Sequence, residues 1–422
     1  MERYSEYKDS GVQWLGEIPG HWKQFQFRKF FKIKKVIAGK EGFDVLAITQ
    51  QGIKIKDITR NEGQLAANYS GYQIVNPTDF AMNHMDLLTG YIDISKYYGV
   101  TSPDYRVFTN ISEEADSKYY LYIFQLCYKR KIFFGLGQGV ANKGRWRLPA
   151  VQLNKFYLPL PPLSEQHSIV SYLDDKCGKI DKMLEGKQKQ IELLAEMKQR
   201  IIADAVTRGL NPDVKMKATN IPWLPEIPEH WAVKPIRAIL RENNEKTETG
   251  DEELLSLSQY TGISRKRDAV KTGMFEAEST IGYKKVHPGQ FVMNIMLAWN
   301  GSYAVSGLEG IISPAYCVFD FISNDNKMYY NYLWRLSVYQ GAFKTESRGI
   351  IDSRLRLYPN KFLPFPTICP PLEEQDSIVN YINEKVVKID TLTSKLQQEI
   401  ESIKEYKQRL ISDVVTGQIK VC

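Results

Sequence analysis

The chain has 422 residues, a formal net charge of +7 and a hydrophobic content of 43%. A chain of this length is expected to hold two or more domains with ordinary buried cores, which excludes a disordered tail. The modest positive charge permits nucleic-acid binding without requiring it.

The cysteines and the apolar runs indicate in which cellular environment the protein is expected to work. Five cysteines are far apart and lack Cys-x-x-Cys spacing, so we expect neither a disulfide framework nor a zinc site, and a reducing, cytoplasmic environment. The first ten residues carry no basic-then-apolar leader, and proline and glycine interrupt the longest uncharged run, 286–308. We therefore expect no signal peptide and no membrane span.

Local patterns in the globular parts predict mixed secondary structure. Seven basic residues alternate with phenylalanines over 23–40, which predicts an amphipathic strand or helix whose phenylalanines are core. Short β-forming runs predict strands at 44–49, 72–75, 105–108 and 131–135. Aromatic-rich runs at 119–130 and 328–343 each predict one helix, with the aromatic rings in the core.

The strongest feature of the sequence is an internal repeat. A repeat of long period determines the domain organisation, so it is analysed before any local motif. PPLSEQHSIVSYL at 161–173 returns as PPLEEQDSIVNYI at 370–382, and WLGEIPGHW at 14–22 returns as WLPEIPEHW at 223–231. Both pairs are 209 positions apart. The stretches between these anchors have diverged. We therefore expect the closely repeated parts to meet something common and the divergent interiors to do different jobs.

Two long helices are predicted after the proline pairs at 161–162 and 370–371, since proline cannot lie inside a helix. Apolar residues then recur in alternating steps of three and four, which is a heptad seam. The seam comprises Leu173, Ile180, Leu184, Ile191, Leu194 and Ile201 in the first copy and Ile382, Ile389, Leu396, Ile400, Ile403 and Leu410 in the second.

Neither helix can bury its seam alone, so we expect the two helices to pair as an antiparallel coiled coil. The alternative is that each helix packs only on its own domain. Lys187, Lys198 and Lys407 interrupt the seam and are expected to mark places where the pair opens or meets a third partner.

The predicted fold class is α+β, with two similar globular domains, each followed by a long helix, and with pseudo-two-fold symmetry. The expected boundaries are 1–160 for the first domain, 161–209 for the central helix, 210–369 for the second domain, 370–417 for the distal helix and 418–422 for a C-terminal tail.

The sequence offers poor candidates for catalysis. GVANKGR at 139–145 lacks the Lys-Ser/Thr ending of a phosphate loop, and no dinucleotide signature is present. Asp104, Asp116 and Lys118 resemble a loose nuclease arrangement, but Asp104 corresponds to an alanine in the second half. The repeated histidines, His21 and His230, each precede a tryptophan and are expected to pack a domain edge against a helix end. The sequence therefore favours a binding protein.

Basic residues recur in corresponding regions of both halves. Arginine can read guanine or hold phosphate, and lysine mostly holds phosphate. The candidate DNA-binding residues are Lys54, Lys56, Arg60, Lys143, Arg145 and Arg147 in the first half and Arg265, Lys266, Arg267, Arg348, Arg354 and Arg356 in the second. Any one of these could instead belong to a solvated face.

The two repeated motifs, W-L-x-E-I-P-x-H-W and P-P-L-x-E-Q-x-x-I-V-x-Y, resemble those of the specificity subunit of type I restriction–modification enzymes. The resemblance covers almost the whole chain in the family's order of target-recognition domain, conserved helix, target-recognition domain and conserved helix. It implies that each target-recognition domain reads one half of a bipartite, asymmetric site in double-stranded DNA.

The resemblance further implies that the helices set the gap of unspecified base pairs and dock two methylation subunits. S-adenosylmethionine, ATP and magnesium would belong to the methylation and restriction subunits, and this chain would carry no cofactor and no catalytic residue. Two alternatives remain open: a coiled-coil scaffold that binds only proteins, and a self-sufficient nuclease using Asp104, Asp116 and Lys118.

Overall fold

The computed structural model describes residues 2–59, 66–139, 146–259, 261–268, 279–349 and 355–421. The chain divides into two compact units. Unit 1 comprises Met1–Gln188 and Gln397–Cys422, and unit 2 comprises Lys189–Leu396. Each unit thus holds one globular domain, the first part of the helix that follows it and the last part of the other helix. Unlike the boundaries expected from the sequence, this division cuts both long helices.

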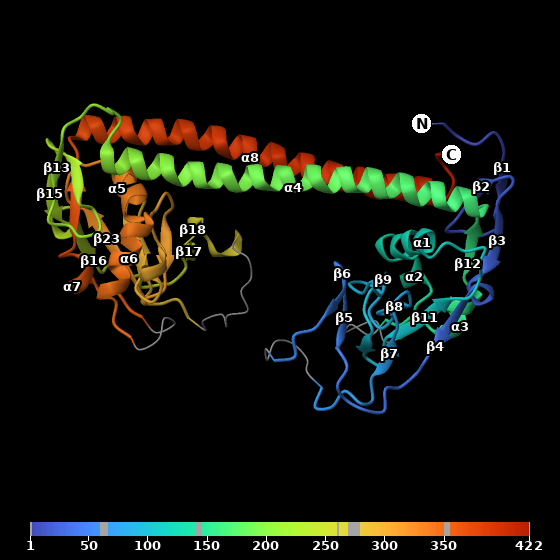
Figure 1. Ribbon diagram of the computed structural model, residues 1–422. Helices are drawn as coiled ribbons and strands as arrows, with labels where there is room; N and C mark the ends of the chain where they lie inside the picture. The colour runs from blue at the N-terminus through green and yellow to red at the C-terminus, as the bar shows by residue number, and fades with distance from the viewer. Residues whose placement is uncertain are drawn as a thin grey trace. The chain divides into compact units, whose positions relative to one another are not determined.

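Unit 1 contains the elements of the first half of the chain (Figure 1). They are β1 (Tyr7–Asp9), β2 (Glu17–Pro19), β3 (Lys23–Gln26), η1 (Phe27–Lys29), β4 (Phe31–Lys34), β5 (Leu46–Thr49), β6 (Gly52–Ile55), β7 (Gln73–Val75), β8 (Phe80–Met82), β9 (Ile92–Ile94), β10 (Gly99–Thr101), β11 (Arg106–Asn110), α1 (Ser117–Lys129), α2 (Ile132–Gly135), α3 (Ala150–Lys155), β12 (Tyr157–Leu160) and the start of α4 (Leu163–Arg208).

Unit 2 repeats this order with small changes. Its elements are β13 (Met216–Ala218), β14 (Glu226–Pro228), β15 (Ala232–Pro235), η2 (Ile236–Ala238), β16 (Leu240–Asn243), β17 (Leu255–Ser258), β18 (Gly262–Arg265), η3 (Lys266–Asp268), β19 (Lys284–Val286), β20 (Phe291–Asn294), η4 (Ala298–Asn300), β21 (Tyr303–Val305), β22 (Gly310–Ile312), β23 (Tyr316–Phe321), α5 (Lys327–Trp334), α6 (Ser337–Glu346), α7 (Pro359–Phe362), β24 (Pro366–Cys369) and the start of α8 (Leu372–Val415).

The described strands pair in the same antiparallel pattern in both units. The central sheet has the order β4-β11-β8-β9 in unit 1 and β16-β23-β20-β21 in unit 2. Four two-stranded ribbons accompany each central sheet, among them the hairpins β5-β6 and β17-β18. The predicted α+β class, with one long helix after each of two similar domains, is confirmed.

Aromatic side chains form the core of each unit, as the sequence predicts. In unit 1, Phe27 and Phe31 from the basic segment pack with Phe80, Phe108 and Phe124, and all five are almost fully buried. The corresponding core of unit 2 contains fully buried tyrosines and tryptophans from β21, α5 and α6. The last turns of α8 join the core of unit 1, and those of α4 join the core of unit 2.

Two of the predicted elements are wrong. Residues 131–135, predicted as a strand, contain the short helix α2, which follows Lys131 in a left-handed conformation (φ 57°) and buries Phe133. Four apolar residues carry too little periodicity to distinguish a strand from a helical turn. The run 328–343, predicted as one helix, is split into α5 and α6 because Leu336 has an extended backbone.

Within each unit the segments of α4 and α8 run antiparallel. In unit 1, Asp181 pairs with Lys407 and Lys187 pairs with Glu399, so the partner number falls as the α4 number rises. In unit 2, Lys198 pairs with Asp390, and Gly209 lies beside Glu374. In the described part of the chain, no helix combines the length and the apolarity needed to cross a membrane.

Candidate nucleic-acid interface and helix pair

The repeated motifs meet at a carboxylate near the start of each long helix. In unit 1, Glu165 accepts hydrogen bonds from the Trp22 indole nitrogen (2.9 Å) and the Tyr4 hydroxyl (2.9 Å), and it lies 2.6 Å from His21 Nε2. Unit 2 repeats the arrangement, with Glu374 at 3.0 Å from Trp231 Nε1 and 2.7 Å from His230 Nε2. The prediction that the histidine–tryptophan pair packs a domain edge against a helix end is confirmed.

A glutamine next to each carboxylate ties the long helix to a globular helix. Gln166 is fully buried; its side-chain oxygen accepts from the backbone N–H of Asp116, and its amide donates to the Pro161 carbonyl. Gln375 makes the equivalent bonds to Asn326 and Pro370. The P-P-L-x-E-Q string therefore builds a structural junction.

The end of each long helix docks on the junction within the same unit. The Tyr119 hydroxyl donates to the Val415 carbonyl at 2.8 Å, and the Tyr329 hydroxyl donates to the Val206 carbonyl at 2.8 Å. Gly417 has φ +76°, and a side chain there would approach Pro19 to 2.5 Å. The close approach and the left-handed backbone both require glycine at this helix end.

The twelve predicted seam residues of the two long helices are all buried or partly buried. Leu173, Ile382, Ile389, Ile400 and Leu410 are the buried ones. This burial follows from the heptad pattern, since each seam faces the neighbouring helix segment or the globular core of its unit.

The seam lysines have partners within their units, contrary to the expectation that they open the helix pair. Lys407 donates to Asp181 at 2.6 Å, Lys198 donates to Asp390 at 2.8 Å, and Lys187 pairs with Glu399. A lysine stem can cover the apolar seam while its ammonium group reaches a carboxylate at the rim. The three lysines therefore form ion pairs across the helices.

Five of the candidate DNA-binding residues lie on or directly after two corresponding hairpins, β5-β6 in unit 1 and β17-β18 in unit 2. Lys54 lies exposed on β6, and Lys56 follows that strand. Arg265 ends β18, and Lys266 and Arg267 form the exposed η3 turn after it. Arg267 is 3.3 Å from Glu253, so part of its charge is compensated.

The remaining described candidates lie at the base of one loop in each unit. The backbone of Arg147 exchanges hydrogen bonds with that of Gln138 (2.8 and 3.0 Å), and the backbone of Arg356 exchanges them with that of Arg348 (3.0 and 2.9 Å). The candidates Arg60, Lys143, Arg145 and Arg354 lie outside the described residues.

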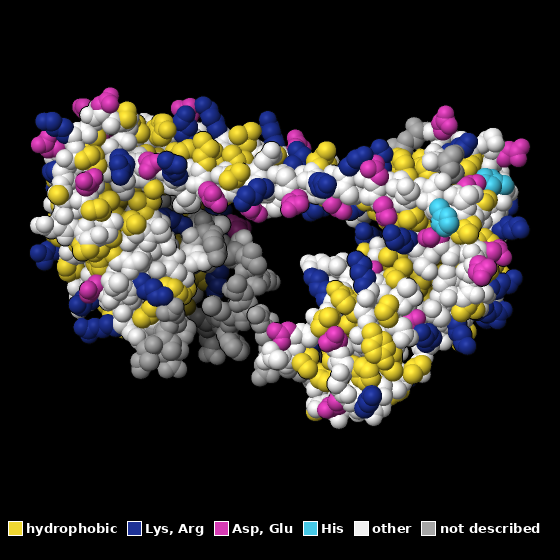
Figure 2. All heavy atoms as spheres, viewed as in Figure 1, with side chains coloured by type: hydrophobic (Ala, Val, Ile, Leu, Met, Phe, Trp, Pro, Cys, Tyr) yellow, Lys and Arg dark blue, Asp and Glu magenta, His cyan; other side chains and the backbone are white. Residues whose placement is uncertain are grey.

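Charge on the long helices is mixed rather than gathered. On the face that Figure 2 shows, Lys and Arg side chains alternate with Asp and Glu along α4 and α8. Several of these charges form pairs within one helix, such as Lys179 with Asp175 and Lys388 with Glu384. On this face, the mixed charges do not form the uncompensated basic stripe that is typical of a phosphate-binding track.

The three residues of the nuclease alternative have structural environments. Asp116 caps α1 by accepting a hydrogen bond from the Tyr119 N–H at 2.8 Å. Lys118 lies 3.5 Å from Asp174 of α4, and Asp104 lies exposed in a turn before β11. Within the described ranges, no group of three His, Cys, Asp or Glu side chains is placed to hold a metal ion. The geometry does not favour a nuclease.

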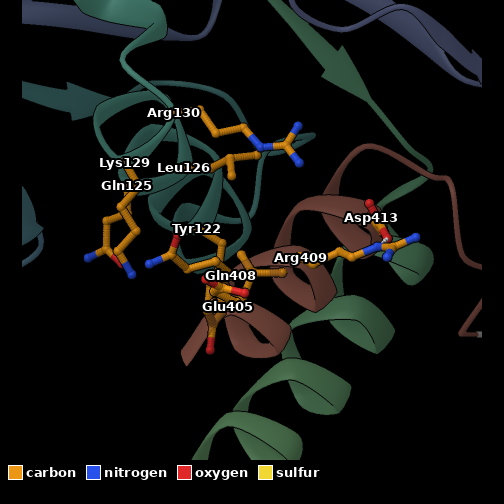
Figure 3. Close-up of a pocket in the computed structure, with 10 residues that line it drawn as sticks. Tyr122, Gln125, Leu126, Lys129, Arg130, Glu405, Gln408, Arg409 and Asp413 are labelled. Atoms are coloured by element: carbon orange, nitrogen blue, oxygen red, sulfur yellow. Dashed lines mark ion pairs between the residues drawn. The ribbon is translucent and has the colours of Figure 1, made fainter. Parts of the chain in front are cut away.

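A cavity of about 410 Å³ lies in unit 1 between α1 and the last turns of α8 (Figure 3). On the α8 side, Arg409 extends along the helix to Asp413, 3.5 Å away. The residues of α8 that line this cavity, Glu405, Gln408, Arg409, Ile411 and Asp413, have identical counterparts in α4, namely Glu196, Gln199, Arg200, Ile202 and Asp204. The α1 residues that complete the cavity, apart from Tyr122 and Leu126, are not repeated in unit 2.

Residues 21–193 match the model of the type I restriction modification DNA specificity domain. Among curated proteins, the chain is 27% identical over 287 residues to the type I restriction enzyme MjaVIII specificity subunit of Methanocaldococcus jannaschii, a match that covers 63% of this chain and 62% of that one. It is 22% identical over 447 residues to the putative type I restriction enzyme MjaX specificity subunit of the same organism, covering 96% of each.

Solved structures share the fold. A chain from a structure on complex assembly and conformational transition of the type I R-M system aligns over 95% of this chain and 99% of its own length, with a TM-score of 0.66 and 12% identity. The HsdS subunit from Thermoanaerobacter tengcongensis aligns over 95% and 98%, with a TM-score of 0.50 and 13% identity. The chain therefore carries a match to the type I restriction modification DNA specificity domain over residues 21–193 and is similar to curated type I restriction enzyme specificity subunits.

Proposed function

We propose that this chain selects the DNA sequence for a type I restriction–modification complex. Each globular domain reads one half of a bipartite, asymmetric site, and the helix pair sets the gap of unspecified base pairs. Base-edge contacts in the major groove give specificity, and phosphate contacts give much of the affinity. Methylation subunits carry out adenine methylation, and restriction subunits add translocation and cleavage.

One observation carries this proposal: the structural parts of the two units are repeated closely, whereas the regions that are candidates for reading DNA differ. The junctions around Glu165 and Glu374, the sheet order and the helix seams repeat closely. The candidate base-reading regions differ: on the equivalent hairpin strands, unit 1 has Lys54 and Ile55 where unit 2 has Ser264 and Arg265. Two DNA-binding regions of different sequence on the same repeated fold fit a DNA site whose two halves differ in sequence.

Repeated exposed features on the helices support the docking of two copies of one partner. Met183 and Tyr406 of unit 1 are 54% and 49% exposed, and their counterparts Leu392 and Met197 of unit 2 are 51% and 54% exposed. Each directly precedes a seam position, so all four fall on the same flank in heptad terms. Exposed apolar side chains at equivalent places fit two methylation subunits, one for each unit.

We further propose that the chain is non-catalytic and holds no cofactor. S-adenosylmethionine, ATP and magnesium then belong to the partner subunits. The roles of Asp116 as a helix cap and of Lys118 as the neighbour of Asp174 support this assignment.

A domain exchange tests the proposal. Residues 23–150 are replaced by the equivalent region of a relative with a different methylated motif, and methylated adenines are mapped in cells that contain the methylation subunits. We expect one half of the motif to change while the other half and the gap persist. The matched control replaces 232–359, which is expected to change the opposite half. An unchanged motif in both exchanges would remove DNA reading from this chain.

The two alternatives have direct tests. Cleavage of DNA by the purified chain alone with magnesium, lost in Asp116→Ala, would establish a nuclease and overturn our proposal. Assembly with methylation subunits but no effect of either domain exchange would establish a scaffold that binds only proteins.

A further inference from the structure

At one end of the central sheet, both units have an equivalent site, which we call the slot. It contains His84 and Arg106 in unit 1 and Ile295 and Cys317 in unit 2, so the polarity and charge of its side chains differ between the units. The Leu148 N–H donates to the His84 carbonyl at 3.0 Å in unit 1, as the Leu357 N–H donates to the Ile295 carbonyl at 2.9 Å in unit 2. Arg106 pairs with Met82 of β8 as Cys317 pairs with Met293 of β20. The register therefore makes His84 equivalent to Ile295 and Arg106 equivalent to Cys317.

In unit 1 the slot is filled by a buried cation. Arg106 is 8% exposed, and one of its guanidinium nitrogens donates to the Leu148 carbonyl at 2.9 Å. Burial lowers the pKa of Arg106 to about 10, which leaves it charged at neutral pH. No carboxylate of the described residues forms an ion pair with it. A buried charge without a counter-charge is costly, and five N–H donors exceed what one carbonyl can satisfy.

His84 adds a second unsatisfied group to this slot. Its Nδ1 is buried without a hydrogen-bond partner among the described residues. Burial, and then the charges of Arg106 and Arg147, lower the pKa of His84 to about 3, so the ring is neutral. The slot therefore combines a buried guanidinium, a neutral imidazole and the exposed Arg147 on the adjoining loop base.

In unit 2 the equivalent slot is hollow. A cavity of about 400 Å³ is lined by Ile295, Cys317, Glu242 and Arg348, together with residues of α7. Glu242 of β16 stands where β4 has Ile33, since both face the equivalent phenylalanine of the next strand, and it lies 3.8 Å from Lys284. Burial raises the pKa of Cys317 to about 11, so the floor of the hollow is neutral. This slot opens to the surface and, unlike the described part of the unit 1 slot, contains a carboxylate, Glu242, together with Arg348 and Lys361.

We infer that the unit 1 slot binds a hydrogen-bond acceptor of DNA, and that the exchange of Arg106 and His84 for Cys317 and Ile295 is one cause of the difference between the two half-sites. Arg147 makes the contact. Arg106 is a positioning residue: its hydrogen bond to the Leu148 carbonyl fixes the backbone that carries Arg147, and its positive charge adds to that of Arg147. The acceptor is a phosphate oxygen or the O6 and N7 atoms of guanine, the two acceptors that arginine binds in DNA. This inference rests on the proposed function.

The experiment uses the specificity chain assembled with its methylation subunits. Arg147→Ala, Arg106→Met and Arg106→Lys are compared with the unchanged chain by DNA affinity over a range of salt concentrations and by mapping of methylated adenines. The first half-site is defined as the one that changes when residues 23–150 are exchanged. Arg335→Met is the matched control, since Arg335 is a half-buried arginine of unit 2 that donates to the Tyr303 carbonyl at 3.0 Å.

We expect Arg147→Ala and Arg106→Met to weaken binding about tenfold or more, with the second half-site read as before, and Arg106→Lys to restore most of the loss. Relaxed choice at one base of the first half-site identifies a guanine contact. An unchanged motif with a salt slope reduced by about one identifies a phosphate contact. Arg335→Met is expected to leave the first half-site unaffected.

Two results would overturn the inference: unchanged affinity, slope and motif for Arg147→Ala, or relaxation of both half-sites to the same degree. Arg147 is exposed, so its replacement tests the slot even if Arg106→Met prevents folding. If the domain exchange alters one half of the motif while these variants do not, the slot assignment fails and the proposed function stands. If the domain exchange itself has no effect, the proposed function fails.

Discussion

Glu165 at the start of α4 accepts a hydrogen bond of 2.9 Å from the indole nitrogen of Trp22, a residue that lies 143 positions earlier in the chain. Trp22 is fully buried, and Glu374 with Trp231 repeats the contact at 3.0 Å in unit 2. The two repeated motifs of the sequence are therefore the two sides of one junction, formed once in each unit.

This junction is expected to contribute to stability. Glu165→Ala removes a charged acceptor and leaves the indole N–H of a buried tryptophan unpaired, so we expect the free energy of unfolding to fall by about 2–3 kcal/mol. Urea unfolding followed by tryptophan fluorescence measures the change. Glu185→Ala, at an exposed position of α4, is the control and should cost less than about 0.5 kcal/mol. Equal losses in the two variants would contradict a specific role for the junction.

The ion pair between Lys407 and Asp181 is expected to give a small, salt-sensitive coupling. Asp181 is 59% exposed in its side chain, and Lys407 is 22% exposed. A double-mutant cycle with Lys407→Met and Asp181→Asn should yield about 0.5–1 kcal/mol at low salt and less at high salt, since exposed charges are screened. No coupling at low salt would mean that the lysine contributes only through its apolar stem.

The environment of His84 predicts a loss of stability in acid. The pKa of His84 is lowered to about 3 in the folded chain from 6.5 as the ordinary value, so the unfolded chain binds a proton that the folded chain does not between these limits. The contribution is fully present above pH 6.5 and is lost as the pH falls. Its slope is at most about 1.4 kcal/mol per pH unit, reduced by the partial exposure of the ring.

His84→Ile, which installs the unit 2 residue, should therefore lose less stability than the unchanged chain between pH 7.5 and 5.5, as measured by urea unfolding. Between pH 7.5 and 8.5 the two proteins should change equally, which is the control. A parallel decline of the two proteins in acid would show that His84 does not titrate in this range.

If the exposed apolar side chains of Met183 and Tyr406 dock a methylation subunit, charged substitutions there should reduce the number of methylation subunits that bind. Met183→Asp with Tyr406→Asp places charge on the flank in unit 1 only, so we expect the chain to retain one methylation subunit instead of two, measured by sedimentation of the complex. Lys182→Asp, at the neighbouring exposed position, is the control and should keep two. Retention of two subunits by the flank variant would place docking elsewhere.

The length of the helix pair predicts the length of the gap. Insertion of one heptad into α4 and one into α8 adds about 10 Å at 1.5 Å per residue, which corresponds to about 3 base pairs of DNA. Methylome mapping should then find both half-sites unchanged and further apart. An unaltered gap would defeat the role of the helices as a spacer.

The sequence predicted most of the frame and little of the reading surface. Repeat and heptad are regular over many residues, so the two long helices and the seam from Leu173 to Leu410 could be derived from pattern alone. Of the strands, only β5, β7 and β11 were predicted. The short run 131–135 could not be derived from pattern, because a helix of four residues has no periodicity of its own. The slot residues His84 and Arg106 were missed, although each differs from its counterpart within otherwise similar stretches.

The sequence by itself determined that the chain is a tandem repeat with two seams that need partners, because apolar spacing alone sets which face of a helix must be buried. Only the tertiary structure decided where the seam lysines place their charge, since Asp181, Asp390 and Glu399 are far from them in sequence. It also decided that Gln166 and Glu165 serve the junction and that Arg106 is buried with no ion-pair partner among the carboxylates that the structure describes. These facts depend on distances between segments that folding brings together, which no local pattern encodes.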